Sequence, residues 1–142
     1  MEKGRSGEDA AVRFLRRRGW LPLVRNWTVP TGGELDIVAI RDGVLAVIEV
    51  KSRRSAQELH EPVSLAQRAR LGRGAAAFLH RNPQLSRLCV RFDLILVARS
   101  RRPPRITHQK GAFDPPVRRD ETNGTGPRPD LGHRRVDARG PR

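Results

Sequence analysis

Four charged side chains in the middle of the chain have the types and spacing of a metal-dependent hydrolytic site. They are Glu34, Asp36, Glu49 and Lys51, within the stretch 33–53 that reads GELDIVAIRDGVLAVIEVKSR. Carboxylate oxygens suit Mg²⁺ and Mn²⁺, and Mg²⁺ usually takes one or two carboxylates while it keeps several waters. A lysine beside such an ion can orient a water molecule or neutralise a developing anion. The residue types therefore favour hydrolysis assisted by Mg²⁺ or Mn²⁺.

A β-hairpin is needed to bring these side chains together. The Asp-Gly pair at 42–43 lies between two apolar runs, which is a strong signal for a two-residue hairpin turn. Such a turn places Asp36 opposite Glu49, and Glu34 opposite Lys51. Cβ atoms of directly opposed residues lie ~4.5–5.5 Å apart. We therefore expect three carboxylates and one ammonium group to converge at the open end of the hairpin.

Both faces of this hairpin are expected to be covered. One face carries Val38, Ile40, Leu45 and Val47, and the other carries Leu35, Ile37, Ala46, Ile48 and Val50. Strands that are apolar on both faces belong inside a covered sheet. A solvated, charged hairpin end is the alternative, but carboxylates at the end of a covered strand are costly unless they bind a cation. The pattern favours Asp36 and Glu49 as metal ligands, while Glu34 either contacts a second metal or orients Lys51.

This pattern resembles the PD-(D/E)XK nuclease superfamily and, more narrowly, the small bacterial YraN-like family within it. The matching pieces are the Gly-Glu-x-Asp strand, the Glu-Val-Lys run, Lys3-Gly4 with Gly7-Glu8, Arg25-Asn26-Trp27, Arg91-Phe92-Asp93 and Ala112-Phe113. The resemblance covers about residues 3–113. It implies a restriction-endonuclease-like fold and a metal-dependent nuclease. It also implies that the Val50 carbonyl is a further metal ligand and that Glu8 joins the metal site from the first helix.

The charge of the chain indicates a polyanionic partner. The 142 residues carry a formal net charge of +14, and residues 1–112 hold 22 of the 29 basic but only 10 of the 15 acidic residues. A folded part this basic favours nucleic acid, with DNA expected first and RNA left open. A coding bias toward arginine is the alternative, but it does not explain the shortage of acids. The lone Cys89, expected to be a small buried side chain, and the lack of a signal peptide or an apolar span of ~20 residues suggest a cytoplasmic protein.

The expected elements give an α-β-β-β-α-β order. We predict a helix over 6–18 capped by Ser6, a strand over 21–29, the hairpin, a helix over 63–80, a strand over 91–98 and a short strand over 106–108. The crossover from the hairpin to the strand at 91–98 calls for a parallel pair. The fold class is therefore α/β, a mixed sheet with helices on both faces. Residues 1–112 form this domain, and residues 113–142, rich in Pro, Gly and Arg, read as a disordered tail.

The second helix is expected to carry both packing and phosphate-binding residues. Its apolar stripe is predicted as Leu65, Ala69, Gly72, Ala76 and Leu79. The candidate nucleic-acid contacts are Arg53, Arg54, Arg68, Arg70, Arg73 and Gln67. Gln67 stands where YraN-like proteins usually have a lysine, which puts a catalytic cation on this helix in doubt, and it also suits a helix cap with Ser64.

Two function classes follow from the sequence. The first is a metal-dependent nuclease acting on DNA, branched or single-stranded, and a domain this small that cuts both strands is expected to form a homodimer. The second is a binding module that keeps the fold and the basic surface without cutting. The histidines and Cys89 lack the spacing of a zinc site, and phosphate-binding glycine loops of nucleotide hydrolases are absent from the sequence.

Overall fold

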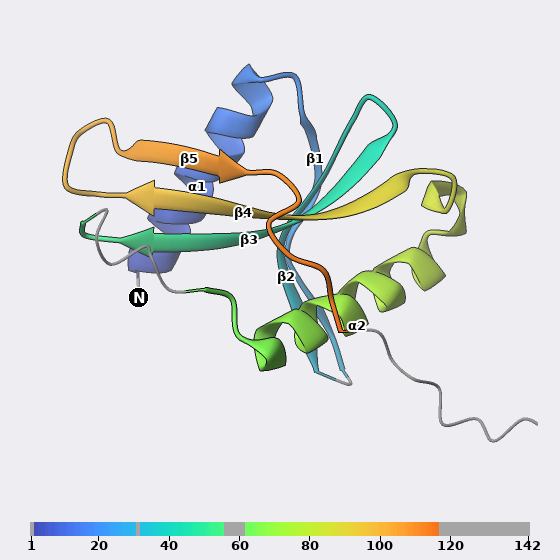
Figure 1. Ribbon diagram of the computed structural model, residues 1–142. Coiled ribbons are helices and arrows are strands. Elements are labelled where there is room, and N and C mark those ends of the chain that lie inside the picture. The colour runs from blue at the N-terminus through green and yellow to red at the C-terminus, as the bar shows by residue number, and fades with distance from the viewer. Residues whose placement is uncertain (1, 31, 56–61, 117–142) are drawn as a thin grey trace, which may run out of the picture.

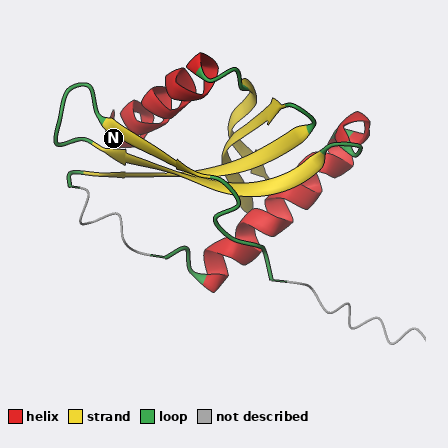
Figure 2. Ribbon diagram, turned by 45° about the horizontal axis from the view of Figure 1, so that its top comes forward, coloured by secondary structure: helices red, strands yellow, loops and turns green. Residues whose placement is uncertain are grey.

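One mixed β-sheet carries a helix on each face (Figure 1, Figure 2). The computed structural model describes residues 2–30, 32–55 and 62–116, with side chains from Gly7 onward. The elements are α1 (Glu2–Arg17), β1 (Leu21–Val29), β2 (Gly33–Arg41), β3 (Val44–Arg53), α2 (Leu65–Arg81), the 3₁₀ turn η2 (Pro83–Leu85), β4 (Cys89–Ala98) and β5 (Arg105–Gln109). The sheet order is β1-β2-β3-β4-β5, and β3 pairs with β4 in parallel while the other pairs are antiparallel. The α/β fold class and the element order predicted from the sequence are confirmed.

The first helix begins earlier than predicted and ends within one residue of the predicted end. It starts at Glu2, so Ser6 lies inside it and does not cap it. At its end, the Gly19 N–H donates to the Arg16 carbonyl at 3.1 Å and the Trp20 N–H donates to the Leu15 carbonyl at 3.0 Å. This is a Schellman ending, and Gly19 supplies its left-handed residue at φ +81°. Trp20, which follows this ending, is buried in the core.

The central hairpin has the predicted turn and the predicted register. Asp42 and Gly43 both have positive φ, +48° and +75°, as a type I′ turn requires. The β2–β3 ladder then runs from the pair Arg41–Val44 out to Ile37–Ile48, and it ends there. Beyond this point β2 continues beside β1, and β3 continues beside β4. The two strands of the hairpin therefore part and form a fork.

The fork changes which face of the sheet Leu35 occupies. Leu35 was expected to share a face with Ile37, but it packs in the core under α2 together with Val38, whereas Ile37 packs in the core under α1. Strict alternation along β2 is thus interrupted at Asp36, the residue between them. The prediction for Leu35 was wrong because simple alternation assumes a strand that stays flat and paired on both sides.

The second helix packs through a different stripe from the predicted one. Its buried residues are Leu71, Gly74, Ala75 and Phe78, not the predicted set of Leu65, Ala69, Gly72, Ala76 and Leu79. Leu65 is 72% exposed. Small apolar residues lie on two sides of this helix, so periodicity alone could not choose between them. Contacts with the sheet determine which side is buried. The Phe78 ring meets the Trp27 ring edge-on with centroids 5.4 Å apart, and a Cβ added to Gly74 would lie 2.8 Å from Leu35 Cδ2.

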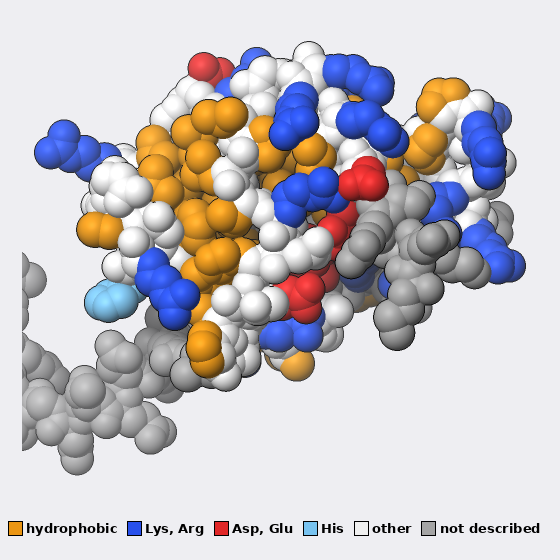
Figure 3. All heavy atoms as spheres, turned by 180° about the vertical axis from the view of Figure 1, so that it is seen from behind, with side chains coloured by type: hydrophobic (Ala, Val, Ile, Leu, Met, Phe, Trp, Pro, Cys, Tyr) orange, Lys and Arg blue, Asp and Glu red, His pale blue; other side chains and the backbone are white. Residues whose placement is uncertain are grey.

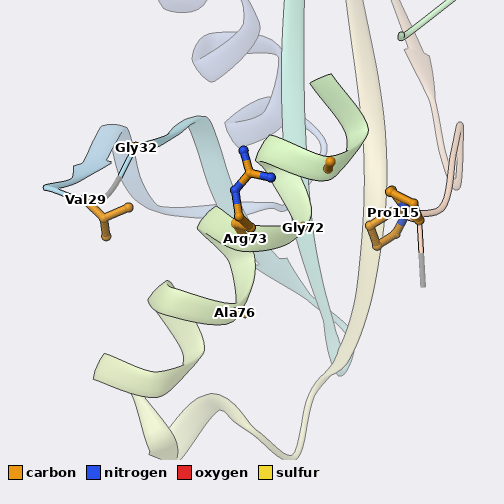
Figure 4. A pocket seen from close by; sticks show the side chains of 8 residues that line it. Val29, Gly32, Gly72, Arg73, Ala76 and Pro115 are labelled. Carbon is orange, nitrogen blue, oxygen red and sulfur yellow. The ribbon is translucent and has the colours of Figure 1, made fainter. Parts of the chain in front are cut away.

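The packed part of the chain extends past residue 112. Phe113, expected to begin the tail, is buried against Phe92 with ring centroids 5.6 Å apart. Pro115 lies over α2, where an added Cβ on Gly72 would be 2.7 Å from Pro115 Cβ (Figure 4). Residues 117–142, the rest of the expected tail, lie outside the described residues. Cys89 was expected to be buried but is exposed, because β4 begins at it.

Among the described residues, helix length and hydropathy leave no candidate for a membrane-crossing helix.

Candidate active site

A side chain of β2 bridges the fork between β2 and β3. The Val50 N–H, which has passed the end of the β2–β3 ladder, donates to Asp36 Oδ2 at 2.9 Å. A side-chain carboxylate thus satisfies a backbone donor for which the diverging strand no longer offers a carbonyl. The same bond orients the Asp36 carboxylate into the fork. The resemblance implied a role for the Val50 carbonyl, whereas the contact that the structure describes is made by the Val50 N–H.

Asp36 and Glu49 form a carboxylate pair at this fork, as the hairpin register predicts. Their side chains are hydrogen-bonded to each other, and both are partly buried. Burial raises the pKa of Asp36, and burial together with the neighbouring Asp36 charge raises the pKa of Glu49 to about 7. Two buried carboxyl groups in contact share a proton when no cation is present, since both cannot ionise freely. The pair is therefore an electrostatic site that favours a bound cation.

Lys51 lies on β3 two residues after Glu49, on the same side of the strand. It is only 7% exposed. Its charge acts on Glu49 and favours the ionised form of that carboxyl group. A buried ammonium beside a carboxylate pair is the arrangement that the sequence motif predicted.

Glu8 reaches the site from α1 because this helix packs very closely on β3. A Cβ added to Gly7 would lie 2.7 Å from Ser52 Cβ, so only glycine permits this approach. Burial raises the pKa of Glu8, while a hydrogen bond with the Asn26 side chain lowers it and the nearby Asp36 charge adds to the rise. Its Oε2 is buried and makes no hydrogen bond with the described residues. Glu8 therefore borders the carboxylate pair with an oxygen that could still accept a donor or a cation.

Asn26 is a site residue that sequence reasoning did not assign a role. It takes a left-handed conformation, φ +47°, in the middle of β1 and contacts Glu8 through its side chain. Asparagine tolerates this conformation better than most residues. The Asn in a strand pattern was the available signal. Its neighbour Arg25 pairs with Asp9 of α1, which ties β1 to the same helix.

Glu34 lies at the margin of the site. It was expected opposite Lys51, but the β2–β3 ladder stops at Ile37–Ile48, and Glu34 pairs instead with Thr28 of β1. Glu34 is exposed. Its charge still contributes to the raised pKa values of Asp36 and Glu8, after burial.

The donor set fits a hard divalent cation with few protein ligands. Among the described residues, no three His, Cys, Asp or Glu side chains are arranged to hold a metal ion together. The implied set of Glu8, Asp36 and Glu49 is thus not closed around one point. Two carboxylates with raised pKa values, and one buried glutamate oxygen that accepts no hydrogen bond from the described residues, suit Mg²⁺ or Mn²⁺ that keeps most of its waters.

Arg70 of α2 is the candidate phosphate contact that the fold brings to the carboxylates. It is exposed, and its charge lowers the pKa of both Asp36 and Glu49, against the larger effect of burial. Sequence reasoning placed Arg70 among phosphate-binding residues without linking it to the pair. The link depends on the orientation of α2, which periodicity misassigned.

The other predicted contacts are distributed over several parts of the surface. Gln67 and Ser64 form a capping box, so Gln67 serves as the N-cap partner. The Arg68 Nε donates to the Val63 carbonyl at 3.0 Å, and one Arg53 guanidinium nitrogen donates to the Ser52 carbonyl at 2.9 Å. These contacts are local to each residue.

Two further arginines face separate hollows. Arg73 borders an apolar hollow beside α2, between Val29 and Pro115 (Figure 4). Arg54 borders a second hollow at the carboxyl ends of β3 and β4, together with Arg99, Arg101 and Arg102. The last three were not predicted, although the run 99–105 is visibly rich in arginine.

Acidic side chains form a row on the face shown in Figure 3, and Lys and Arg side chains surround that row. The described part of the fold thus combines a small acidic centre with a basic surface, which is the charge distribution expected for a site that binds a cation and a polyanion together.

A separate buried ion cluster supports the sheet beside this site. Asp93 of β4 is fully buried and accepts hydrogen bonds from Arg91 at 2.8 and 2.9 Å, from His108 Nε2 at 2.8 Å and from the Gly111 N–H at 2.9 Å. Burial alone would raise its pKa, but these partners hold the pKa of Asp93 at about 2. Asp93 and Arg91 thus form a structural ion pair.

The fold and the site define a mixed α/β protein with a paired-carboxylate and lysine centre at a strand fork. The chain belongs to the uncharacterised protein family UPF0102, whose family model matches residues 7–97. A UPF0102 protein of Myxococcus xanthus is 39% identical over 115 residues, which cover 80% of this chain and 90% of that protein. A UPF0102 protein of Syntrophotalea carbinolica is 42% identical over 113 residues, covering 78% of this chain and 90% of that protein. The region that the family model matches contains Glu8, the hairpin and most of β4.

Proposed function

We propose that this protein is a metal-dependent nuclease of the PD-(D/E)XK type that hydrolyses phosphodiester bonds in DNA. The observation that carries the proposal is the hydrogen-bonded Asp36–Glu49 pair at the fork, with the buried Lys51 on the same strand. The element order and the YraN-like sequence pattern support the same class. A net charge of +14 supports a nucleic-acid substrate.

Asp36 and Glu49 would hold Mg²⁺ or Mn²⁺, with Glu8 as the nearest additional carboxylate. Such an ion, when bound, lowers the pKa of water and stabilises charge on a phosphoryl group. The chain itself contributes a preorganised setting. The Val50 N–H fixes the Asp36 carboxylate, so the pair does not have to reorganise when substrate arrives.

Lys51 and Arg70 supply positive charge on the chain itself. Lys51 is buried beside Glu49 and would orient the attacking water or neutralise the developing anion. Arg70 is exposed, its charge acts on both carboxyl groups, and it would bind a substrate phosphate. Glu34, at the exposed margin, would limit where the negatively charged strand can pass.

The second candidate is a nucleic-acid-binding module that does not cut. The four arginines of the hollow at the ends of β3 and β4 favour it, because phosphate binding there does not depend on the carboxylates. Binding and cutting are therefore measured separately.

The deciding experiment follows cleavage of labelled linear duplex, single-stranded and four-way-junction DNA, and of RNA, with Mg²⁺ or Mn²⁺. The variants are Asp36→Asn, Glu49→Gln and Lys51→Met, and the matched control is Asp42→Asn, an exposed carboxylate at the hairpin turn. We expect each site variant to lose at least ~100-fold in rate while nucleic-acid binding is retained. Salt-sensitive binding without cutting under either metal would favour the binding module. Cutting that is equal in all variants would overturn the assignment of the site.

A further inference from the structure

A basic hollow lies at the far end of α1 from Glu8. Its cations come from separate parts of the chain: Arg17 and Arg18 at the end of α1, Arg41 at the hairpin turn, and Arg105 and Lys110 around β5. None of the described residues that line the hollow is acidic. The cations lie far apart in sequence, so the fold itself brings them together.

The floor of this hollow is rigid and partly aromatic. Trp20 and His108 meet edge-on at 5.9 Å, and His108 is fixed by its hydrogen bond to Asp93. The Arg18 guanidinium lies over the Phe14 ring, 4.4 Å from its centroid, which holds its planar donor group in place. A stacked guanidinium is preorganised to bind a phosphate through two donors.

The cations are not neutralised by the described carboxylates around them. Arg41 pairs with Asp42 at 3.2 Å, but both side chains are exposed, and such pairs contribute little. Asp93 lies beneath the floor, and its charge is matched by Arg91. Several like charges around one hollow repel one another unless an anion occupies it. The hollow therefore has the chemistry of a phosphate site.

The position of the hollow relative to the carboxylates is set by two elements. Along α1, Arg17 follows Glu8 by nine residues, which is about 14 Å at 1.5 Å per residue. Along β2, Arg41 follows Asp36 by five residues, which is about 17 Å at 3.4 Å per residue. A stacked strand that advances 3.4 Å per nucleotide, as each strand of duplex DNA does, covers this distance in about four to five nucleotides.

We propose that this hollow binds a backbone phosphate of a polynucleotide strand about four to five nucleotides from the bond held at the Asp36–Glu49 pair. The proposal rests on the proposed function and adds to it the path and the minimum length of the substrate. Free nucleotides and inorganic phosphate offer the same chemical group, so the experiment includes them.

The test is binding by the full chain without added divalent cation, which keeps it independent of cutting. The Arg17→Gln/Arg105→Gln variant removes two cations of the hollow. The Arg16→Gln/Arg87→Gln variant removes the same charge from two exposed arginines that do not line it. Fluorescence anisotropy with labelled single strands of about 3 and about 12 nucleotides is recorded over a range of salt concentrations, with inorganic phosphate and a mononucleotide as competitors.

We expect the hollow variant to bind the longer strand several-fold more weakly than the control. The slope of log K against log salt should fall in magnitude by ~0.7 for each phosphate that the variant no longer binds. The short strand, which cannot reach from the hollow to the Asp36–Glu49 pair, should show a smaller difference between the two variants. Equal weakening of the two variants with the longer strand would overturn the proposal. Competition by inorganic phosphate at the same concentration as the longer strand would also overturn it, in favour of a small-anion site.

The two proposals fail separately. If the hollow variant binds more weakly than the control variant and no protein cuts, the nuclease function is removed and the phosphate site is kept. The opposite result is cutting that depends on Asp36 while the hollow variant cuts normally and both arginine variants bind equally weakly. That result would keep the nuclease function and remove the phosphate site.

Discussion

Asp36 Oδ2 accepts the Val50 N–H at 2.9 Å where β2 and β3 separate, so a single carboxylate both closes the end of the hairpin ladder and forms half of the acidic pair. This hydrogen bond explains why the site forms at this position along the hairpin. The strands pair up to Ile37–Ile48 and then follow different neighbours, which opens space for side chains between them. The end of the hairpin ladder and the proposed chemistry thus both depend on the Asp36 carboxylate. Different substitutions of Asp36 can separate these two roles.

Replacing Asp36 with asparagine and with alanine distinguishes its two roles. Asparagine retains an oxygen that accepts the Val50 N–H but removes the charge, so we expect loss of cutting with little loss of stability. Alanine leaves that N–H without its acceptor, and we expect it to lower the free energy of unfolding by about 1–3 kcal/mol more than asparagine. Urea denaturation of both variants measures the difference. Equal stability of the two would contradict the structural role.

The pKa of Glu49 predicts how the stability of the metal-free protein depends on pH. The folded-state pKa is raised to about 7 from 4.5, mainly by burial, so folding disfavours ionised Glu49. Its favourable contribution is present below pH 4.5 and is lost as the pH rises through about 7. We therefore expect Glu49→Gln to gain stability on the order of 2 kcal/mol relative to wild type as the pH rises through this range.

The matching metal experiment uses the same pair of proteins. Above pH 7, Mg²⁺ or Mn²⁺ should raise the thermal midpoint of the wild type, because a bound cation relieves the repulsion between ionised Asp36 and Glu49. The Glu49→Gln protein should show a smaller increase. If the free energies of unfolding of the metal-free wild type and of Glu49→Gln change in parallel across this pH range, the raised pKa of Glu49 is contradicted.

Asp93 is expected to be one of the most sensitive positions for stability. Its pKa of about 2 lies below the usual 3.8, so its contribution is fully present above pH 3.8 and is lost as the pH falls through about 2. Asp93→Asn removes the anion that Arg91 and His108 contact, and we expect a loss of about 2–4 kcal/mol at neutral pH. The control Asp42→Asn, at an exposed ion pair, should change stability by less than about 0.5 kcal/mol. Urea denaturation near pH 7 compares the two, and similar values for both would refute the structural assignment.

Gly7→Ala tests the close packing that brings Glu8 to the site. The added Cβ would lie 2.7 Å from Ser52 Cβ, so α1 has to move away from β3 and carry Glu8 with it. We expect a net loss of about 1–3 kcal/mol in urea denaturation, despite the better helix propensity of alanine, together with slower cutting. The control Gly72→Ala meets Pro115 at the same distance, but Pro115 lies in a C-terminal segment outside the sheet and can shift. Gly72→Ala should therefore cost less and leave cutting unchanged, and the reverse order would contradict this account.

The sequence by itself determined the features that depend on neighbouring residues. The Asp-Gly turn established the hairpin and its register, which in turn predicted that Asp36, Glu49 and Lys51 would lie together. Gly19 marked the end of α1, and Ser64 with Gln67 marked the start of α2. These signals are local because turn and cap conformations are set by about two to five consecutive residues.

Only the tertiary structure decided the features that depend on distant neighbours. The buried stripe of α2 was misassigned because the helix has two apolar sides, and the choice between them depends on Leu35 and Trp27 of the sheet. The face of Leu35 depends on the fork, which arises because β2 and β3 follow different partner strands. The proximity of Arg70 to the acidic pair and the grouping of Arg17, Arg41 and Arg105 have the same origin, since long-range packing sets which surface residues meet.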